Sequence, residues 1–246
     1  MQHEQYAAHA QFEDQHWWFT ARRAILRKLI HAVAPPGSGI ALMDIGCGTG
    51  GNAASLAAEY DVLGIDPSAD AIGYAQSRFP GVRFIQTDDL EAGRAHLIRS
   101  GVVLILDVLE HVADDRGLLD RAVNVVPAGG HLVLTVPADP ALWSRHDTQY
   151  GHFRRYRSAE FRALWCDAAV EERLLSPFNA RLWPVIAAIR RFTRDTGSDF
   201  DIPVGGLNAV LRRIFAGEAA ALVRAIDSGK PAFSRGVSLV AVLRKR

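Results

Sequence analysis

A glycine-rich loop follows the short apolar run at residues 40–43. It reads Asp44-Ile45-Gly46-Cys47-Gly48-Thr49-Gly50-Gly51 and leads into a helical pattern. Glycine lets a ligand approach the backbone amides at the start of a helix, so the loop predicts a nucleotide-like cofactor. Three of its glycines match G-x-G-x-x-G, a pattern that allows NAD. Asp44 favours a different cofactor, because a carboxylate repels a pyrophosphate and attracts an ammonium or sulfonium group.

A second carboxylate, Asp66, follows the apolar run at residues 62–65, about one strand and one helix after the glycine loop. A carboxylate at the carboxyl end of a strand can accept hydrogen bonds from both ribose hydroxyls of a nucleoside cofactor. Asp66 therefore supports a nucleoside cofactor without naming it.

The densest group of polar and aromatic side chains lies at residues 143–156. His146 and His152 could each take a proton from a hydroxyl acceptor or hold that acceptor. Arg154 and Arg155 could bind a phosphate or a carboxylate through their guanidinium groups. The same side chains could instead clamp the loop by satisfying buried carbonyls and acids.

The segments that must position these residues alternate between apolar runs and helical patterns. Five apolar runs rich in β-branched residues predict strands at 40–43, 62–65, 82–85, 102–106 and 132–136. Helical patterns precede or separate them at 20–33, 52–58, 68–77 and 115–126. This alternation predicts a Rossmann-like, doubly wound α/β sheet in three layers. The glycine loop and residues 143–156 would then border one crevice.

The regular alternation of predicted strands and helices ends in the second half of the chain. There we expect a helix at 158–165 with Ser158 as its N-cap, strands at 170–175 and 237–243, and helices near 182–192 and 207–226. The predicted parts are an N-terminal helical cap (1–39), a cofactor-binding core (40–178), a helical insertion (179–232) and the last core strand (233–246).

One apolar stripe runs along residues 207–226 of the insertion. It could be a lid over an apolar acceptor or a helix on a membrane surface, but core packing or a homodimer face is the favoured interpretation. Residues 179–246 carry 12 basic and 5 acidic side chains, which keeps RNA open as a partner.

Composition excludes several classes of protein. The chain has 246 residues, 49% of them hydrophobic, and a formal net charge of +1, which argues against a disordered acidic chain and a histone-like polycation. Its two cysteines are too few for a disulfide framework, so a reducing compartment is expected. We expect neither a secretory signal nor a transmembrane span, and predict a cytoplasmic protein with peripheral membrane contact as an alternative.

Four motifs together resemble those of class I S-adenosylmethionine-dependent methyltransferases. The glycine loop and Gly64-Ile65-Asp66 match the first two motifs, while the segments at 84–90 and 106–112 match the motifs after strands three and four. Pro127-Ala128-Gly129-Gly130 is the usual turn before strand five. The resemblance covers about residues 41–136 and implies a mostly parallel sheet with an antiparallel last strand.

The resemblance implies S-adenosylmethionine (SAM) as the cofactor and S-adenosylhomocysteine as the product. The cofactor contacts it implies are Asp44, Gly46, Cys47 and Gly48 for the methionine part, Asp66 and Pro67 for the ribose, Asp88, Asp89 and Leu90 for the adenine, and Asp107 and Val108 after strand four. Asp88 and Asp89 could instead form a solvated turn.

Gly151-His152-Phe153-Arg154-Arg155-Tyr156 is similar to a signature, G-H-x-R-R-Y, of a bacterial subgroup of these enzymes. Some of its members are associated with glycan or lipid-linked sugar pathways. The expected acceptor-binding residues are Trp17, Trp18, Arg154, Arg155 and Tyr156. The two tryptophans could equally be an aromatic staple that packs the first helix onto the sheet.

The predicted reaction is transfer of a methyl group from SAM to a hydroxyl of a small-molecule or lipid- or glycan-linked acceptor. His152 is the first expected base and His146 the second, and no metal is expected. A non-catalytic SAM-binding module and, less favoured, an RNA methyltransferase are the alternatives. DNA is not expected, because Asp107-Val108-Leu109-Glu110 stands where amino-methyltransferases of nucleic acids carry an Asn/Asp-Pro-Pro-aromatic motif.

Overall fold

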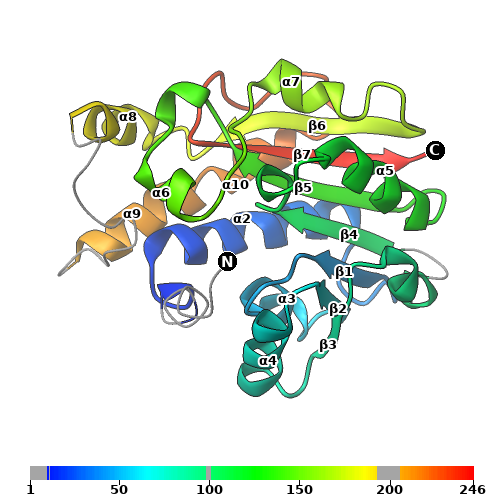
Figure 1. Ribbon diagram of the computed structural model, residues 1–246. Coiled ribbons are helices and arrows are strands. Elements are labelled where there is room, and N and C mark those ends of the chain that lie inside the picture. Colours follow the sequence, from blue (N-terminus) through cyan, green and yellow to red (C-terminus); the bar gives the residue numbers. More distant parts are fainter. Residues whose placement is uncertain (1–9, 11, 98–100, 193–205) are drawn as a thin grey trace.

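The computed structural model describes residues 10, 12–97, 101–192 and 206–246. Its seven-stranded sheet has the order β3-β2-β1-β4-β5-β7-β6 (Figure 1). The strands are β1 (Ala41–Ile45), β2 (Asp61–Asp66), β3 (Arg83–Gln86), β4 (Gly101–Leu106), β5 (His131–Pro137), β6 (Val170–Phe178) and β7 (Ser238–Lys245). The first five are parallel, and β7 runs antiparallel to both β5 and β6. The predicted fold class is confirmed.

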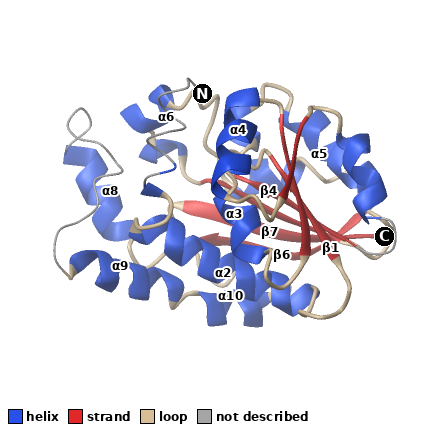
Figure 2. Ribbon diagram, turned by 90° about the horizontal axis from the view of Figure 1, so that it is seen from below, coloured by secondary structure: helices blue, strands red, loops and turns tan. Residues whose placement is uncertain are grey.

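Both faces of the sheet are buried, so its central strands are apolar throughout. In β4, Val102 and Leu104 point into one core cluster, and Val103 and Ile105 into the other. The first cluster lies under α2 (Trp17–Val33), α3 (Gly51–Leu56), α4 (Ala69–Arg78), α9 (Leu207–Ala216) and α10 (Ala219–Ala225) (Figure 2). The second lies under the 3₁₀ segment η1 (Leu90–Leu97), α5 (Asp115–Val125) and α7 (Ser158–Ala163).

Helix α2 begins three residues before the predicted start because two side chains cap its first amides. The Trp18 N–H donates to Nδ1 of His16 at 3.2 Å, and the Trp17 N–H donates to Oδ1 of Asn208 at 2.8 Å. Asn208 belongs to α9, so the start of the N-terminal helix is bound to the helices inserted between β6 and β7. Sequence spacing carries no sign of this long-range cap.

Two further helix predictions are wrong in detail. Ser158 is the first residue of α7 rather than its N-cap; Arg157 takes that place, and its N–H donates to Glu160 at 3.0 Å. The predicted single helix at 207–226 is two helices, α9 and α10, separated at Gly217 and Glu218. The buried Glu218 carboxylate accepts the Arg181 N–H at 2.8 Å, which binds this break to the turn after β6.

The apolar stripe at 207–226 is mainly core packing. Phe215 and Leu222 are fully buried, and α9 and α10 both pack against α2, whereas Leu207 and Val210 at the start of α9 are exposed. Residues 193–205 of the predicted insertion lie outside the described residues. No helix in the described part of the chain is long and apolar enough to cross a membrane.

Candidate active site

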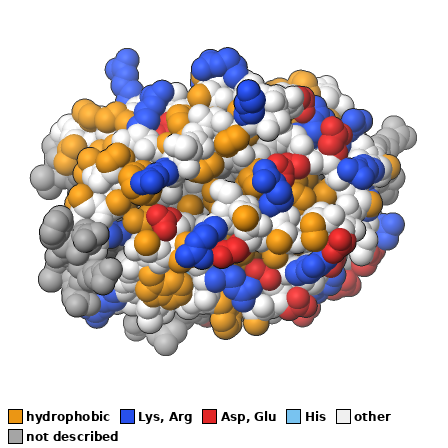
Figure 3. Space-filling view, turned by 90° about the horizontal axis from the view of Figure 1, so that it is seen from above, with side chains coloured by type: hydrophobic (Ala, Val, Ile, Leu, Met, Phe, Trp, Pro, Cys, Tyr) orange, Lys and Arg blue, Asp and Glu red, His pale blue; other side chains and the backbone are white. Residues whose placement is uncertain are grey.

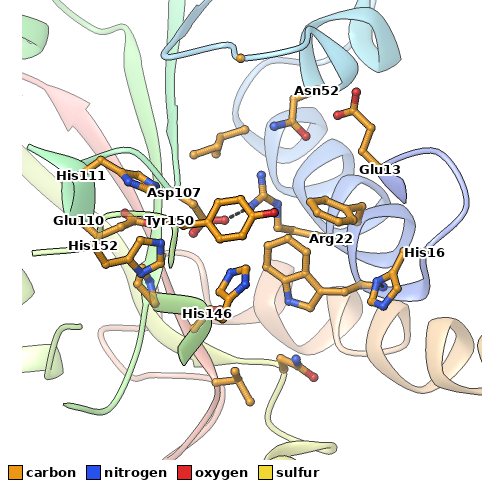
Figure 4. A pocket seen from close by; sticks show the side chains of 18 of the residues that line it. Glu13, His16, Arg22, Asn52, Asp107, Glu110, His111, His146, Tyr150 and His152 are labelled. Atoms are coloured by element: carbon orange, nitrogen blue, oxygen red, sulfur yellow. Dashed lines mark hydrogen bonds and ion pairs between the residues drawn. The ribbon is translucent and has the colours of Figure 1, made fainter. Parts of the chain in front are cut away.

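A cavity of about 360 Å³ lies over the carboxyl ends of β1, β4 and β5, a size suited to a small ligand. Its walls come from the glycine loop, the segment after β4, the loop 138–157 after β5, the start of α2 and α8 (Trp183–Phe192). Figure 4 shows the charged and histidine side chains pointing into this space from elements far apart in sequence.

The glycine loop needs glycine at Gly46 and favours it at Gly48, which have φ of 68° and 55°. A Cβ on Gly46 would lie 2.6 Å from Cγ2 of Val108, so the loop packs directly on the segment after β4. The Gly48 N–H donates to Oδ2 of Asp66 at 3.0 Å, and the Ser68 N–H donates to Oδ1 of the same carboxylate at 2.8 Å. Asp66 thus holds the loop to the start of α4.

Asp44 lies beneath the loop and is 1% exposed. Burial raises its pKa to about 7, while the nearby Arg22 guanidinium favours the charged form. Burial also raises the pKa of Asp66. These carboxylates stand behind the glycine loop rather than among the described residues that line the cavity.

The residues expected near adenine lie outside the cavity. Asp88 and Asp89 are exposed after β3, and Leu90 is buried under the sheet. Oδ1 of Asp89 accepts the Glu91 N–H at 3.0 Å and so caps η1, which agrees with a local turn. Pro67 is exposed and Val108 packs on the loop; neither lines the described cavity.

Asp107 turns the chain sharply at the end of β4. Its φ is 56°, a costly conformation for a residue other than glycine, and its N–H donates to the Thr135 carbonyl at 2.9 Å. Its carboxylate forms an ion pair with Arg22, whose guanidinium lies 4.7 Å from the Trp18 ring (Figure 4). Burial lowers the pKa of Arg22 to about 10. Arg22 was missed as a site residue, although its spacing from Ile25 places it on the buried face of α2.

Three histidines and a glutamate gather on the opposite wall. The His111 and His152 rings pack edge to face with 4.6 Å between their centroids. The centroid of the His146 ring lies 6.0 Å from that of His152. Glu110, in the 3₁₀ turn Leu109–His111, is 1% exposed, and burial raises its pKa to about 8. Burial lowers the pKa of His111 to about 4, so its imidazole is neutral at pH 7. The sequence analysis selected His146 and His152 but missed Glu110 and His111, which stand in the motif after β4.

Asp147 in α6 (Arg145–Gln149) positions this cluster. Its fully buried carboxylate accepts hydrogen bonds from Nδ1 of His152 and Nε of Arg155, both at 2.8 Å. Burial alone would raise the pKa of Asp147, but these bonds and the Arg155 charge hold it well below its usual range. The Phe153 N–H donates to the Glu110 carbonyl at 2.7 Å, which docks the loop on the segment after β4.

Two of the expected acceptor-binding residues serve the fold instead. Arg154 forms an ion pair with Asp115 at 2.6 Å and donates to the Ala113 carbonyl at 3.0 Å. The Tyr156 hydroxyl donates to Asp115 at 2.8 Å. Both side chains turn away from the cavity because they bind Asp115, the first residue of α5. Arg155 does line the cavity.

Trp17 and Trp18 line the cavity, and both also pack against the core cluster under α2. The Trp17 ring meets Phe215 of α9 at 6.1 Å. Ile186 and Ile189 of α8 line the same cavity and add apolar surface to it. The cavity therefore combines these apolar side chains with the polar side chains of Glu110 and the histidines.

Two cavity residues had no usable signal in the sequence. Glu13 accepts the Thr49 hydroxyl at 2.9 Å and pairs with Arg78, so it covers the glycine loop from the N-terminal segment. Asn179, after β6, is buried with φ of 54°. Neither stands in a recognisable motif.

A family model described as a methyltransferase domain matches residues 6–181. This is more than half of the chain, so the chain belongs to that family. Its fold resembles the plantazolicin methyltransferase BamL (TM-score 0.56, 15% identity, 92% of this chain and 85% of that one) and a TehB-like SAM-dependent methyltransferase from Corynebacterium glutamicum (TM-score 0.51, 20% identity, 91% and 88%).

Among curated relatives, the chain is 30% identical over 160 residues to a trans-aconitate 2-methyltransferase of Deinococcus radiodurans, covering 59% of this chain and 60% of that protein. It is 37% identical over 108 residues to a ubiquinone biosynthesis O-methyltransferase of Azorhizobium caulinodans, covering 41% of each. The chain thus spans less than two thirds of either relative. With the family match, these findings identify a methyltransferase domain in this chain.

Proposed function

We propose that this enzyme transfers the methyl group of SAM to an oxygen atom of a small-molecule or lipid- or glycan-linked acceptor. One observation carries the proposal: the glycine loop lines the same cavity as Glu110, His111, His146 and His152. A methyl donor and a proton acceptor can therefore face the same small volume.

In this proposal the methionine part of SAM lies against Gly46, Cys47 and Gly48, above the charge of Asp44. The ribose reaches Asp66, and the adenine extends towards Asp88. Gly48 supports this placement, because it lines the cavity and a Cβ there would meet no protein atom within 4 Å.

The chemical step is an in-line displacement. The acceptor oxygen attacks the methyl carbon as the carbon–sulfur bond breaks, and S-adenosylhomocysteine leaves with the bonding electrons. His152 takes the hydroxyl proton on the nitrogen that does not bind Asp147, and Asp147 stabilises the resulting imidazolium. His146 is the second base that the cavity offers.

The names of the relatives support a small acceptor that presents oxygen. One is named for trans-aconitate and the other for O-methylation in ubiquinone biosynthesis. Four apolar side chains that line the cavity support an acceptor with an apolar part: Trp17, Trp18, Ile186 and Ile189.

RNA is the weaker candidate. Figure 3 shows Lys and Arg interspersed with Asp and Glu over the face seen from above, so the described residues on that face form no continuous basic strip. A cavity of about 360 Å³ also favours a small molecule over a polymer.

The test is transfer of labelled methyl from SAM into fractionated cell extract, with Asp66→Ala as the blank. Label in the aqueous small-molecule fraction supports a soluble acceptor, and label in the organic fraction supports a lipid-linked one. Label confined to the nucleic-acid fraction, or no transfer above the blank from any fraction, contradicts the proposal.

A further inference from the structure

We propose that Glu110, His111 and His152 form a binding site for a divalent first-row metal ion at the edge of the cavity. One carboxylate oxygen and one nitrogen from each imidazole lie within 4.8 Å of one another. Figure 4 shows the three side chains converging on the same side of the cavity. Two of them are neighbours after β4, and the third comes from the loop after β5.

Glu110 has a carboxylate oxygen that can serve as a ligand. Its Oε2 atom is buried and accepts no hydrogen bond from any described residue. A buried carboxylate oxygen without a partner is costly, and native proteins rarely leave one in that state. A cation between the carboxylate and the two imidazoles would satisfy it.

His152 is oriented as a metal ligand usually is. Nδ1 of His152 binds Asp147 at 2.8 Å, which leaves Nε2 as the nitrogen for a metal. Ligating histidines commonly give their second ring nitrogen to a carboxylate or a backbone carbonyl in this way. The His111 ring packs edge to face on the His152 ring, with 4.6 Å between the ring centroids.

The donor set indicates the kind of ion. Two imidazoles and one carboxylate suit Zn²⁺, Fe²⁺, Co²⁺ or Mn²⁺ better than Mg²⁺ or Ca²⁺, which prefer oxygen ligands throughout. Three protein ligands also leave a coordination position for an exogenous group, here on the cavity side. No metal was expected from the sequence, because His152 lies far from Glu110 along the chain and meets it only where the loop after β5 docks.

The role of the ion rests on the proposed function. A metal at this edge would bind the acceptor oxygen and lower the pKa of its hydroxyl. His152 would then be a ligand rather than the base, and the proton would pass to the neighbouring His146. The acceptor would then bind the ion through its hydroxyl oxygen and a second, neighbouring oxygen atom.

The site can be tested without SAM or an acceptor. Chelator-treated wild-type protein is titrated with Co²⁺ and followed by visible absorption and by calorimetry. We expect one ion per chain, with Glu110→Gln and His152→Gln each weakening binding at least about 100-fold, as loss of a direct ligand should. His31→Ala is the matched control, because His31 also pairs with a glutamate, Glu59, but away from the cavity.

Folding is checked by circular dichroism, and Asp147→Asn gives an independent measurement. That variant keeps all three ligands and should weaken Co²⁺ binding by about 10-fold to 100-fold through loss of His152 orientation. Wild-type protein that takes up no stoichiometric Co²⁺, or folded ligand variants that bind it as the wild type does, would overturn the proposal. SAM affinity measured on the same samples tests the proposed function separately.

Discussion

The two walls of the cavity are built from different parts of the chain. Around the glycine loop, the wall is mostly backbone, drawn from consecutive residues after β1 and held by Asp66. The opposite wall is made of side chains from the segment after β4 and the loop after β5, and α2 and α8 close the cavity between them. The first wall is suited to a constant cofactor, and the second can differ between enzymes that share it.

The walls also differ in how their charges are compensated. Asp66 accepts two backbone N–H groups, whereas Asp147 accepts one, from Ser144, together with the side chains of His152 and Arg155. Glu110 retains an oxygen without a hydrogen-bond partner in the described structure. A buried oxygen of Asp44, beneath the glycine loop, also has no hydrogen-bond partner among the described residues, so each wall carries such a carboxylate.

The largest expected effect tests the acceptor wall. His152→Ala should lower kcat by roughly 10²-fold to 10⁴-fold, because it removes either the base or a ligand next to the acceptor. The Kd for SAM should stay unchanged by calorimetry. Arg145→Ala, an exposed change in the same loop, is the control. A wild-type rate in His152→Ala would remove that residue from the chemistry.

The next effect tests the cofactor wall. Asp66→Ala should weaken SAM binding by about 10-fold to 100-fold, because it removes charge-assisted hydrogen bonds to the loop and to the ribose. Asp61→Ala changes an exposed carboxylate at the other end of the same strand and should leave the Kd unchanged. Equal SAM affinity in the two variants would contradict the division between the walls.

A smaller effect concerns the charge beneath the glycine loop. The pKa of Asp44 is raised to about 7 when folded, so the folded state holds a proton that the unfolded state releases near pH 4. The contribution of Asp44 to the stability of the wild type therefore falls as pH rises towards 7, and Asp44→Asn lacks this contribution. The free energy of unfolding of Asp44→Asn minus that of the wild type should therefore rise with pH. The rise should reach up to about 1.4 kcal/mol per pH unit between about pH 4 and 7.

Chemical denaturation across this pH range measures the shift in stability. Asp120→Asn, at an exposed position of α5, is the control and should follow the wild type. A parallel pH dependence of wild type and Asp44→Asn would show that Asp44 ionises normally.

The smallest effect tests the hydrogen bond by which Asn208 of α9 caps the start of α2. Asn208→Ala removes the acceptor for the Trp17 N–H and should cost about 1 kcal/mol of stability, as loss of a helix cap does. Thermal unfolding would show a Tm lower by a few degrees, while Asn124→Ala, at an exposed position of α5, should not change it. An unchanged Tm in Asn208→Ala would mean that the cap contributes nothing.

The contrast between the walls explains what the sequence could predict. The glycine loop, Asp66 and the alternating strands are local patterns, so the order of elements and the fold class followed from them. Asp107, Glu110 and His111 were visible as one motif, but their convergence on His152 depends on how a distant loop docks. Glu13 and Asn208 act through contacts across the fold that no spacing reports.

Arg154 and Arg155 show the same limit within one motif. They are neighbours with the same chemistry, yet Arg155 lines the cavity and Arg154 pairs with Asp115 on α5. Which of the two faces the cavity is decided by the partner that each guanidinium finds, and that partner is set by tertiary packing.

A crystal structure with bound S-adenosylhomocysteine tests the central claim most directly. The account predicts the homocysteine part against Gly46 and Gly48, the ribose at Asp66, and the sulfur facing the wall that carries Glu110 and His152. A sulfur atom directed away from that wall, or an adenine seated among the histidines, would contradict the assignment of one wall to the cofactor and the other to the acceptor.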